Sequence, residues 1–224
     1  MEERYTIPAR EARAEIVVVN SRFVATAAPA LTVEAARAFI ARIRAEFGDA
    51  THNVPAYLVG YGASVIAHCS DDGEPAGTAG RPALTILRGS GLGDVAVVVT
   101  RYFGGTKLGT GGLVRAYSAA VRAVLEVLPR AVKAPTHTVL MALPYRYLEP
   151  VRHLVDLHGG HILGEEFAAD VTVTARFDAA RLPHFQDDLQ QLSSGGIEAV
   201  VIESNPAAIL PLPPGAWRCS TDGG

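Results

Sequence analysis

The chain has 224 residues, of which 49% are hydrophobic and 19% charged, a composition that excludes a disordered protein and fits two folded domains. Its net charge of −3 argues against the uniformly basic surface of a generic nucleic-acid coat protein. The chain has only two cysteines and no apolar run of about 18 residues, and no basic stretch leads into an apolar N-terminal segment. These features favour a cytoplasmic protein with no membrane role.

The first half predicts an α/β domain over residues 1–134. Two short apolar runs separated by Asn20-Ser21-Arg22 predict a β-hairpin, and an amphipathic helix follows Thr32. Residues 94–100 form a nearly continuous apolar run, which predicts the central strand of a sheet. The other expected elements are strands at 56–60 and 65–69, a turn-rich loop at 70–80, a short helix near Pro82 and a long helix at 113–128.

The second half predicts a ferredoxin-like domain over residues 135–206, behind a linker bracketed by Pro129 and Pro135. Its βαββαβ order is typical of that fold. Together the two halves predict an α+β protein, with a loose tail at 207–224. The expected elements are strand 136–143, helix 147–158, strands 161–167 and 170–177, helix 182–193 and strand 197–203.

Charge is divided unevenly along the chain. Residues 1–134 hold 15 Lys and Arg against 12 Asp and Glu, a balance of +3, whereas residues 135–224 hold 5 against 11, a balance of −6. The segment 81–133 alone has a balance of +6. We therefore expect any polyanion to contact the first half.

A glycine-rich segment, 100–112, lies between the expected central strand and a helix. Glycines let the backbone approach a ligand closely, and the free amides that open a helix bind anions. An equal alternative is a crossover in which Arg101 pairs with Asp71, Asp72 or Glu74 and holds two loops together. On the first interpretation, the candidate anion-binding residues are Arg101, Gly104, Gly105, Lys107, Gly109, Gly111, Gly112 and Arg115.

Three carboxylates, Asp71, Asp72 and Glu74, lie within four positions of the turn-rich loop. Such a cluster is able to bind a divalent cation or to supply an acid, but its spacing is not that of a calcium loop. Carboxylates ahead of a helix often cap it, so we favour capping and loop pairing and expect no metal and no cofactor. We also expect no catalytic cysteine, because His68 points to the opposite strand face from Cys69.

Three motifs together resemble the motif series of the YigZ/IMPACT family: ATHNVPAY at 50–57, DDGEPAGTAG at 71–80 and VVVTRYFGGTKLG at 97–109. The resemblance continues through GGLVRAYS at 111–118 and through Ser21-Arg22-Phe23. It implies a polar cluster that matches the family's motifs position by position and lies on one face: His52, Asn53, Asp71, Asp72, Glu74 and Thr78.

The resemblance also implies a fold and a function. The first domain should have the fold with a left-handed βαβ crossover that is shared by a small-subunit ribosomal protein, the protein part of ribonuclease P and domain IV of elongation factor G. The second should be similar to domain V of that factor. Eukaryotic members regulate translation during amino-acid starvation, which implies a partner in the translation apparatus.

We therefore expect a non-enzymatic regulator of translation that binds RNA or a ribosomal component through its first domain. Two alternatives stay open. One is a protein-binding adaptor in the stress regulation of translation. The other is an enzyme in which His52 and the loop carboxylates hold a metal or perform acid-base chemistry, on a phosphate-bearing substrate beside Arg101.

Overall fold

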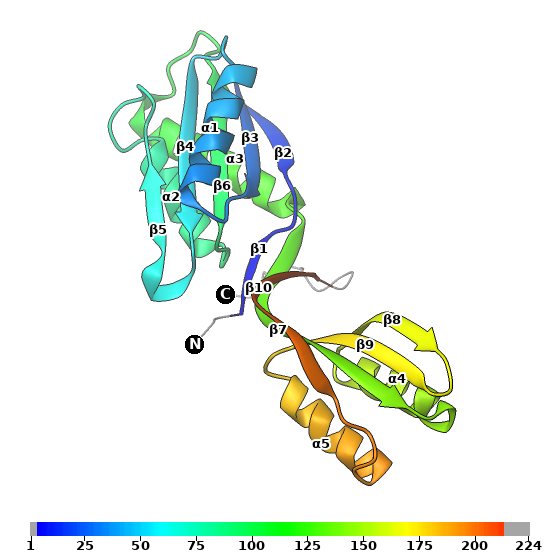
Figure 1. Cartoon of the computed structure of the whole chain (residues 1–224). Helices are drawn as coiled ribbons and strands as arrows, with labels where there is room; N and C mark the ends of the chain where they lie inside the picture. The colour runs from blue at the N-terminus through cyan, green and yellow to red at the C-terminus, as the bar shows by residue number, and fades with distance from the viewer. Residues whose placement is uncertain (1–3, 213–224) are drawn as a thin grey trace, which may run out of the picture. The chain divides into compact units, whose positions relative to one another are not determined.

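The structure, a computed structural model, describes residues 4–212 (Figure 1). The chain divides into two compact units, Tyr5–Val132 and Lys133–Leu210, and each has its own hydrophobic core. Both units are mixed α/β, which confirms the predicted fold class. Within residues 4–212, no helix is both long enough and apolar enough to cross a membrane.

The first unit is built on an antiparallel sheet with strand order β2-β3-β6-β4-β5. The predicted hairpin is confirmed, since β2 and β3 pair around a turn in which Val19 and Asn20 have positive φ. The apolar run at 94–100 forms the central strand, as predicted. The strand bounds are Ala12–Val18 (β2), Ser21–Pro29 (β3), His52–Val59 (β4), Ile66–Cys69 (β5) and Val95–Tyr102 (β6).

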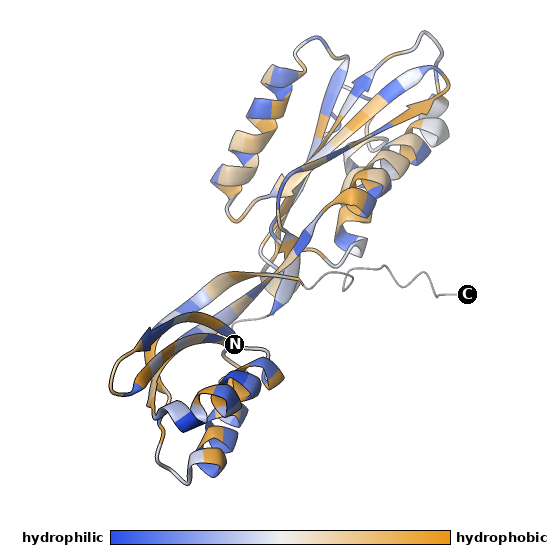
Figure 2. Ribbon diagram, turned by 90° about the vertical axis from the view of Figure 1, so that its right-hand side faces the viewer, coloured by the Kyte–Doolittle hydropathy of each residue, from blue (hydrophilic) through white to orange (hydrophobic). Residues whose placement is uncertain are grey.

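One helix covers one face of this sheet and two helices cover the other, as Figure 2 shows. Helix α1 lies on the first face and starts as predicted, because the Thr32 hydroxyl accepts a hydrogen bond from the Ala35 amide at 3.1 Å. Helices α2 and α3 pack against each other on the second face. The helix bounds are Val33–Glu46 (α1), Gly80–Gly89 (α2) and Gly109–Val127 (α3), with a 3₁₀ turn at Gly62–Ser64.

The strand pairing shows that the first unit contains a left-handed crossover. Strands β3 and β4 are parallel, flank β6 and are joined through α1, whereas β5 and β6 are parallel, flank β4 and are joined through α2. The second pair runs opposite to the first and crosses the sheet in the reverse direction, on the other face. The two crossovers therefore have opposite hands, and one of them is of the rare left-handed kind.

The second unit has the predicted βαββαβ order and a sheet with strand order β10-β7-β9-β8. Strand β9 pairs antiparallel with both β7 and β8, which is the ferredoxin-like arrangement. Side chains from alternate positions of β7 and β9 pack against the two helices. The bounds are Arg130–Leu143 (β7), Leu148–Leu157 (α4), His161–Phe167 (β8), Val171–Asp178 (β9), Leu182–Ser193 (α5) and Val200–Pro211 (β10).

Two sequence predictions at the ends of this unit are wrong. The expected linker between Pro129 and Pro135 is strand, because β7 begins at Arg130 and buries alternate side chains past Pro135. Strand β1 (Tyr5–Pro8) also pairs with β7. The expected loose tail is strand over residues 207–211, and residues 213–224 lie outside the described part of the chain.

Candidate functional site

Asp71 organises the turn-rich loop at 70–80 through its carboxylate, which accepts hydrogen bonds from three backbone amides. The donors are Gly77 at 2.8 Å, Ala79 at 3.1 Å and Gly80 at 2.8 Å. Burial alone would raise the pKa of Asp71, but these amides outweigh it and hold the pKa below its usual value. Because α2 begins at Gly80, Asp71 occupies the position of a helix-capping anion.

Asp72 ties this loop to two other elements. Its carboxylate accepts hydrogen bonds from the Asn53 amide of β4 and from the Arg44 guanidinium of α1, each at 2.6 Å. His52 lies beside it, with Nδ1 2.7 Å from the Asp72 carbonyl oxygen. The Asn53 side chain in turn accepts a hydrogen bond from the Thr100 hydroxyl at 2.7 Å. The loop is therefore fixed against α1, β4 and β6.

Glu74 enters the interior of the first unit and forms a buried ion pair with Arg101. The Arg101 Nη1 atom lies 2.6 Å from Glu74 Oε1, and the two side chains are only 6% and 3% exposed. The Tyr117 hydroxyl donates to the same carboxylate oxygen at 2.8 Å. Burial, followed by the charge of Glu74, raises the pKa of Tyr117 far above its usual value. His52 Nε2 lies 3.9 Å from the same Glu74 oxygen.

The surroundings of Arg101 bear on its prediction as an anion-binding residue, because its side chain is buried. The rings of Phe23 and Phe103 each lie 5.5 Å from its guanidinium carbon, and Ser21 accepts a hydrogen bond from Nη2 at 3.4 Å. The Nε atom is buried without a hydrogen-bond partner. Arg101 therefore follows the alternative in which it pairs with a loop carboxylate, because Glu74 neutralises it inside the fold.

Gly104 allows the chain beyond β6 to pass close to the β2–β3 turn. Its amide donates to the Ser21 hydroxyl at 3.2 Å, and a Cβ at this position would overlap the Asn20 carbonyl. Gly105 follows with φ +85°, a conformation that favours glycine. The close approach of two chain segments therefore accounts for Gly104, and the positive φ accounts for Gly105.

The remaining glycines belong to α3, which begins at Gly109 rather than at the predicted residue 113. The first turn of a helix needs no intrahelical N–H partners, so Gly111 and Gly112 can occupy it. Leu108 at the N-cap makes no side-chain hydrogen bond to these amides. The exposed cation Lys107 lies two positions before the first residue of α3.

Five exposed cations gather on the α2 and α3 side of the sheet, and we call them the basic face: Arg81, Arg88, Lys107, Arg115 and Arg122. The two arginines of each helix are seven residues apart, about two turns, and so share one side of that helix. Within residues 4–212, none of the five has an ion-pair partner within 4.0 Å. Glu126 is the one acid in α2 or α3.

Two of the three cations of α1, on the opposite face, contrast with the basic face because they are paired. Arg42 of α1 pairs with Glu11 and Glu46, and Arg44 pairs with Asp72. A polyanion that approached this side would compete with these carboxylates. The positive charge of residues 81–133, a balance of +6, is therefore exposed to solvent mainly on the basic face.

The donor set that a metal would need is already used within the loop. Asp71 and Asp72 accept hydrogen bonds from backbone amides, and Glu74 accepts hydrogen bonds from the Arg101 guanidinium and the Tyr117 hydroxyl. Among residues 4–212 there is no group of three or more His, Cys, Asp or Glu side chains placed to hold an ion. Thr78 is buried and donates to the Pro75 carbonyl at 2.7 Å, so it supports the loop too.

Sequence reasoning missed three members of this network: Ser21, Arg44 and Tyr117. Ser21 and Tyr117 lie in the quoted motifs, but only their contacts show that they join the polar cluster. A signal for Tyr117 was available, because it follows Leu113 by four positions on the inward stripe of α3. A buried tyrosine hydroxyl needs a partner, which points to a nearby carboxylate.

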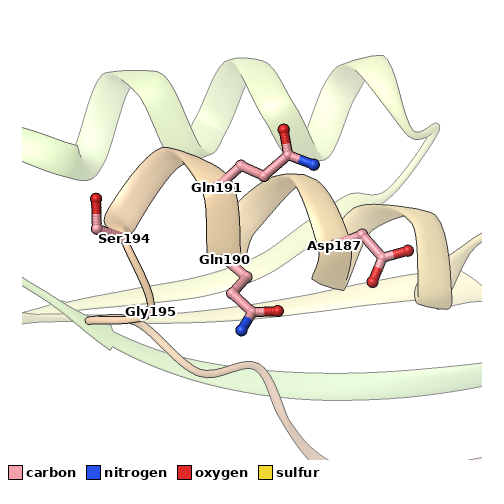
Figure 3. Close-up of a pocket in the computed structure, with 5 residues that line it drawn as sticks. All are labelled: Asp187, Gln190, Gln191, Ser194 and Gly195. Atoms are coloured by element: carbon pink, nitrogen blue, oxygen red, sulfur yellow. The ribbon is translucent and has the colours of Figure 1, made fainter.

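A shallow pocket of about 410 Å³ lies on the second unit, where α5 ends (Figure 3). Its lining includes Gln190 and Gln191, whose side chains point away from each other. A specific small-molecule site needs polar groups that converge on the ligand. This pocket is therefore a weaker candidate than the surfaces of the first unit.

Comparison with known proteins gives matches along most of the chain. The Impact N-terminal domain family matches residues 19–125, and a domain of unknown function, DUF1949, matches residues 141–195. "IMPACT family member YigZ" of Escherichia coli K12 is 38% identical over 202 residues, covering 90% of this chain and 99% of the relative. An "IMPACT family member" of Haemophilus influenzae is 35% identical over 200 residues, covering 89% and 97%.

A solved structure is similar in fold as well as in sequence. It is a "Crystal structure of an hypothetical protein", 37% identical, with a TM-score of 0.57. The match covers 90% of this chain and 98% of that one. Sequence and fold thus agree in relating both units of the chain to one two-domain architecture.

Proposed function

The chain belongs to the IMPACT family, and from this we propose that it is a non-enzymatic protein of translation that binds RNA or a ribosomal component through its first unit. Family membership supports an association with the regulation of translation in general. The basic face supports the more specific part of the proposal, because it exposes five cations while α2 and α3 together contain one acid, Glu126.

Electrostatics explains why this face is suited to RNA. Cations that have no ion-pair partner can neutralise phosphates and release their condensed counterions without first breaking a salt bridge. Lys107 also stands beside the uncapped amides of α3, and helix N-termini attract anions at short range. Since the whole chain carries −3, a long polyanion should bind preferentially in the orientation that presents this face.

The test is fluorescence anisotropy with a structured ribosomal RNA fragment over a range of salt concentrations. The variant carries Arg115→Ala with Arg122→Ala, and the matched control carries Arg22→Ala with Arg42→Ala, two exposed cations that are already paired. We expect the basic-face variant to bind more weakly and its log K against log salt slope to flatten by about 2. The control should keep the slope of the unmodified protein.

Two outcomes would contradict the proposal. One is the absence of RNA binding by the unmodified protein at low salt. The other is an unchanged affinity and slope in the folded basic-face variant. The protein-adaptor alternative would then be the better account, and one feature favours it: Phe167 of β8 and Ile202 of β10 are 58% and 54% exposed on edge strands of the second unit.

A further inference from the structure

A groove of about 460 Å³ runs along the first unit between α1 and the β4–β5 edge of the sheet. It forms because α1 packs on β3, β6 and β4, while β5 lies beyond it as the outer strand (Figure 1). Ile66 of β5 is consequently 52% exposed. The groove is on the opposite sheet face from the basic face, and its volume falls in the range of small-molecule sites.

The floor of the groove is aromatic. Tyr57 and His68 are direct cross-strand partners of β4 and β5, and their ring centroids lie 5.3 Å apart at an interplanar angle of 32°. Tyr57 is buried and lies beside the exposed His68 ring on the same face of the sheet. Ile40 and Pro55 add apolar walls. A flat ring can stack on such a floor, whatever its hydrogen-bonding pattern.

The rim of the groove is cationic. Arg37 and Arg44 both line it from α1, and their separation of seven residues places them about 10 Å apart along the helix. Arg37 is exposed and has no ion-pair partner within residues 4–212. Arg44 gives one Nη atom to Asp72, which leaves other guanidinium donors. No carboxylate lines the groove, so it favours an anion.

We propose that this groove binds a mononucleotide, with the base stacked on His68 and the phosphate held by Arg37. The aromatic floor, the apolar walls and the two cations together suit a planar ring that carries a phosphate. The nucleotide is either free or the 5′-phosphorylated end of a strand, and the recognition chemistry is the same. The proposal is independent of RNA binding by the basic face, and either can fail alone.

Isothermal titration calorimetry of the full chain with AMP, adenosine and inorganic phosphate tests this chemistry. AMP should bind, and adenosine and inorganic phosphate should each bind at least about tenfold more weakly than AMP. Adenosine lacks the phosphate that Arg37 would hold, and inorganic phosphate lacks the base that would stack on His68. Arg37→Ala and His68→Ala should each weaken AMP binding by about tenfold. Arg42→Ala is the matched control, since Arg42 is exposed on the same helix, outside the groove.

A 5′-phosphorylated pentaadenylate distinguishes the two sources of the nucleotide. Tighter binding of this strand, still sensitive to Arg37→Ala, identifies a strand end, whereas tighter binding of AMP identifies a free nucleotide. Ring signals of His68 in NMR spectra of the unmodified protein give a second readout that needs no variant, and they should shift with AMP. Three results would overturn the proposal. The first is no heat of binding with AMP or with the strand at millimolar concentration, and the second is His68 ring signals that do not shift with AMP. The third is AMP binding by Arg37→Ala and His68→Ala that equals AMP binding by the unmodified protein.

Discussion

Replacing Arg101 by Met would leave the Glu74 carboxylate buried beside Tyr117 without its cation. Both members of the pair are more than nine-tenths buried, so water cannot solvate the abandoned charge. Breaking a buried pair by removing one partner costs about 3–5 kcal/mol. With a urea dependence of about 1–3 kcal/mol/M, the midpoint of unfolding of the first unit should fall by roughly 2 M.

The assay is urea unfolding followed by circular dichroism, with two further variants. Adding Glu74→Gln to Arg101→Met removes the abandoned charge, so the double variant should recover part of the lost stability. Arg22→Met is the matched control, because it breaks the exposed pair with Glu15 on the same sheet and should leave the midpoint nearly unchanged. An Arg101→Met midpoint equal to that of the unmodified protein, or no recovery in the double variant, would refute the structural role of the pair.

Two further predictions concern the same loop and the strand before it. The pKa of Asp71 is lowered in the folded state, so its contribution to stability is complete above the unfolded pKa of about 3.9 and is lost as pH falls through the lower folded value. Asp71→Asn should therefore lower the urea midpoint at pH 7, and the midpoint of this variant should fall less than that of the unmodified protein when the pH drops below 4. If the midpoints of the two proteins fall in parallel with pH, Asp71 does not have the capping role. Burial raises the pKa of Cys69, so in a Cys219→Ser background its labelling by iodoacetamide at pH 8 should be slow, and Cys69→Ser should leave RNA affinity unchanged. Rapid labelling with loss of binding would reveal a reactive thiol.

Most of the fold could be predicted because each major element has a local signal. The apolar run at 94–100 and the alternation of strand and helix patterns in the second half are both confirmed. The errors occur where a local signal has a second meaning. Pro135 indicated a break, but proline is tolerated in β7 where no ladder hydrogen bond from its nitrogen is required. Gly111 and Gly112 indicated a loop, yet they lie in the first turn of α3.

The site could be predicted only in part, because pairing between distant segments leaves no local trace. The sequence predicted that Arg101 could pair with a carboxylate of the turn-rich loop, but not which of the three it would be. Glu74 is 27 positions away, and Tyr117 joins them from α3, which covers the sheet face that the Arg101 side chain also occupies. The binding of RNA and the roles of the exposed cations stay predictions, because they are argued from the geometry of this chain alone.

The densest motifs in the sequence form a network that positions the candidate surfaces, and this decides how binding variants should be interpreted. The loop held by Glu74 and Arg101 presents Asp72 to Arg44 at the groove and Asp71 to the first amides of α2, next to Arg81. Loss of Arg101 should therefore disturb both surfaces without either ligand touching it. Weaker RNA binding by an Arg101 variant would not identify a phosphate contact. The same loss in the Arg115 and Arg122 variant would, because within residues 4–212 those side chains make no hydrogen bond or ion pair.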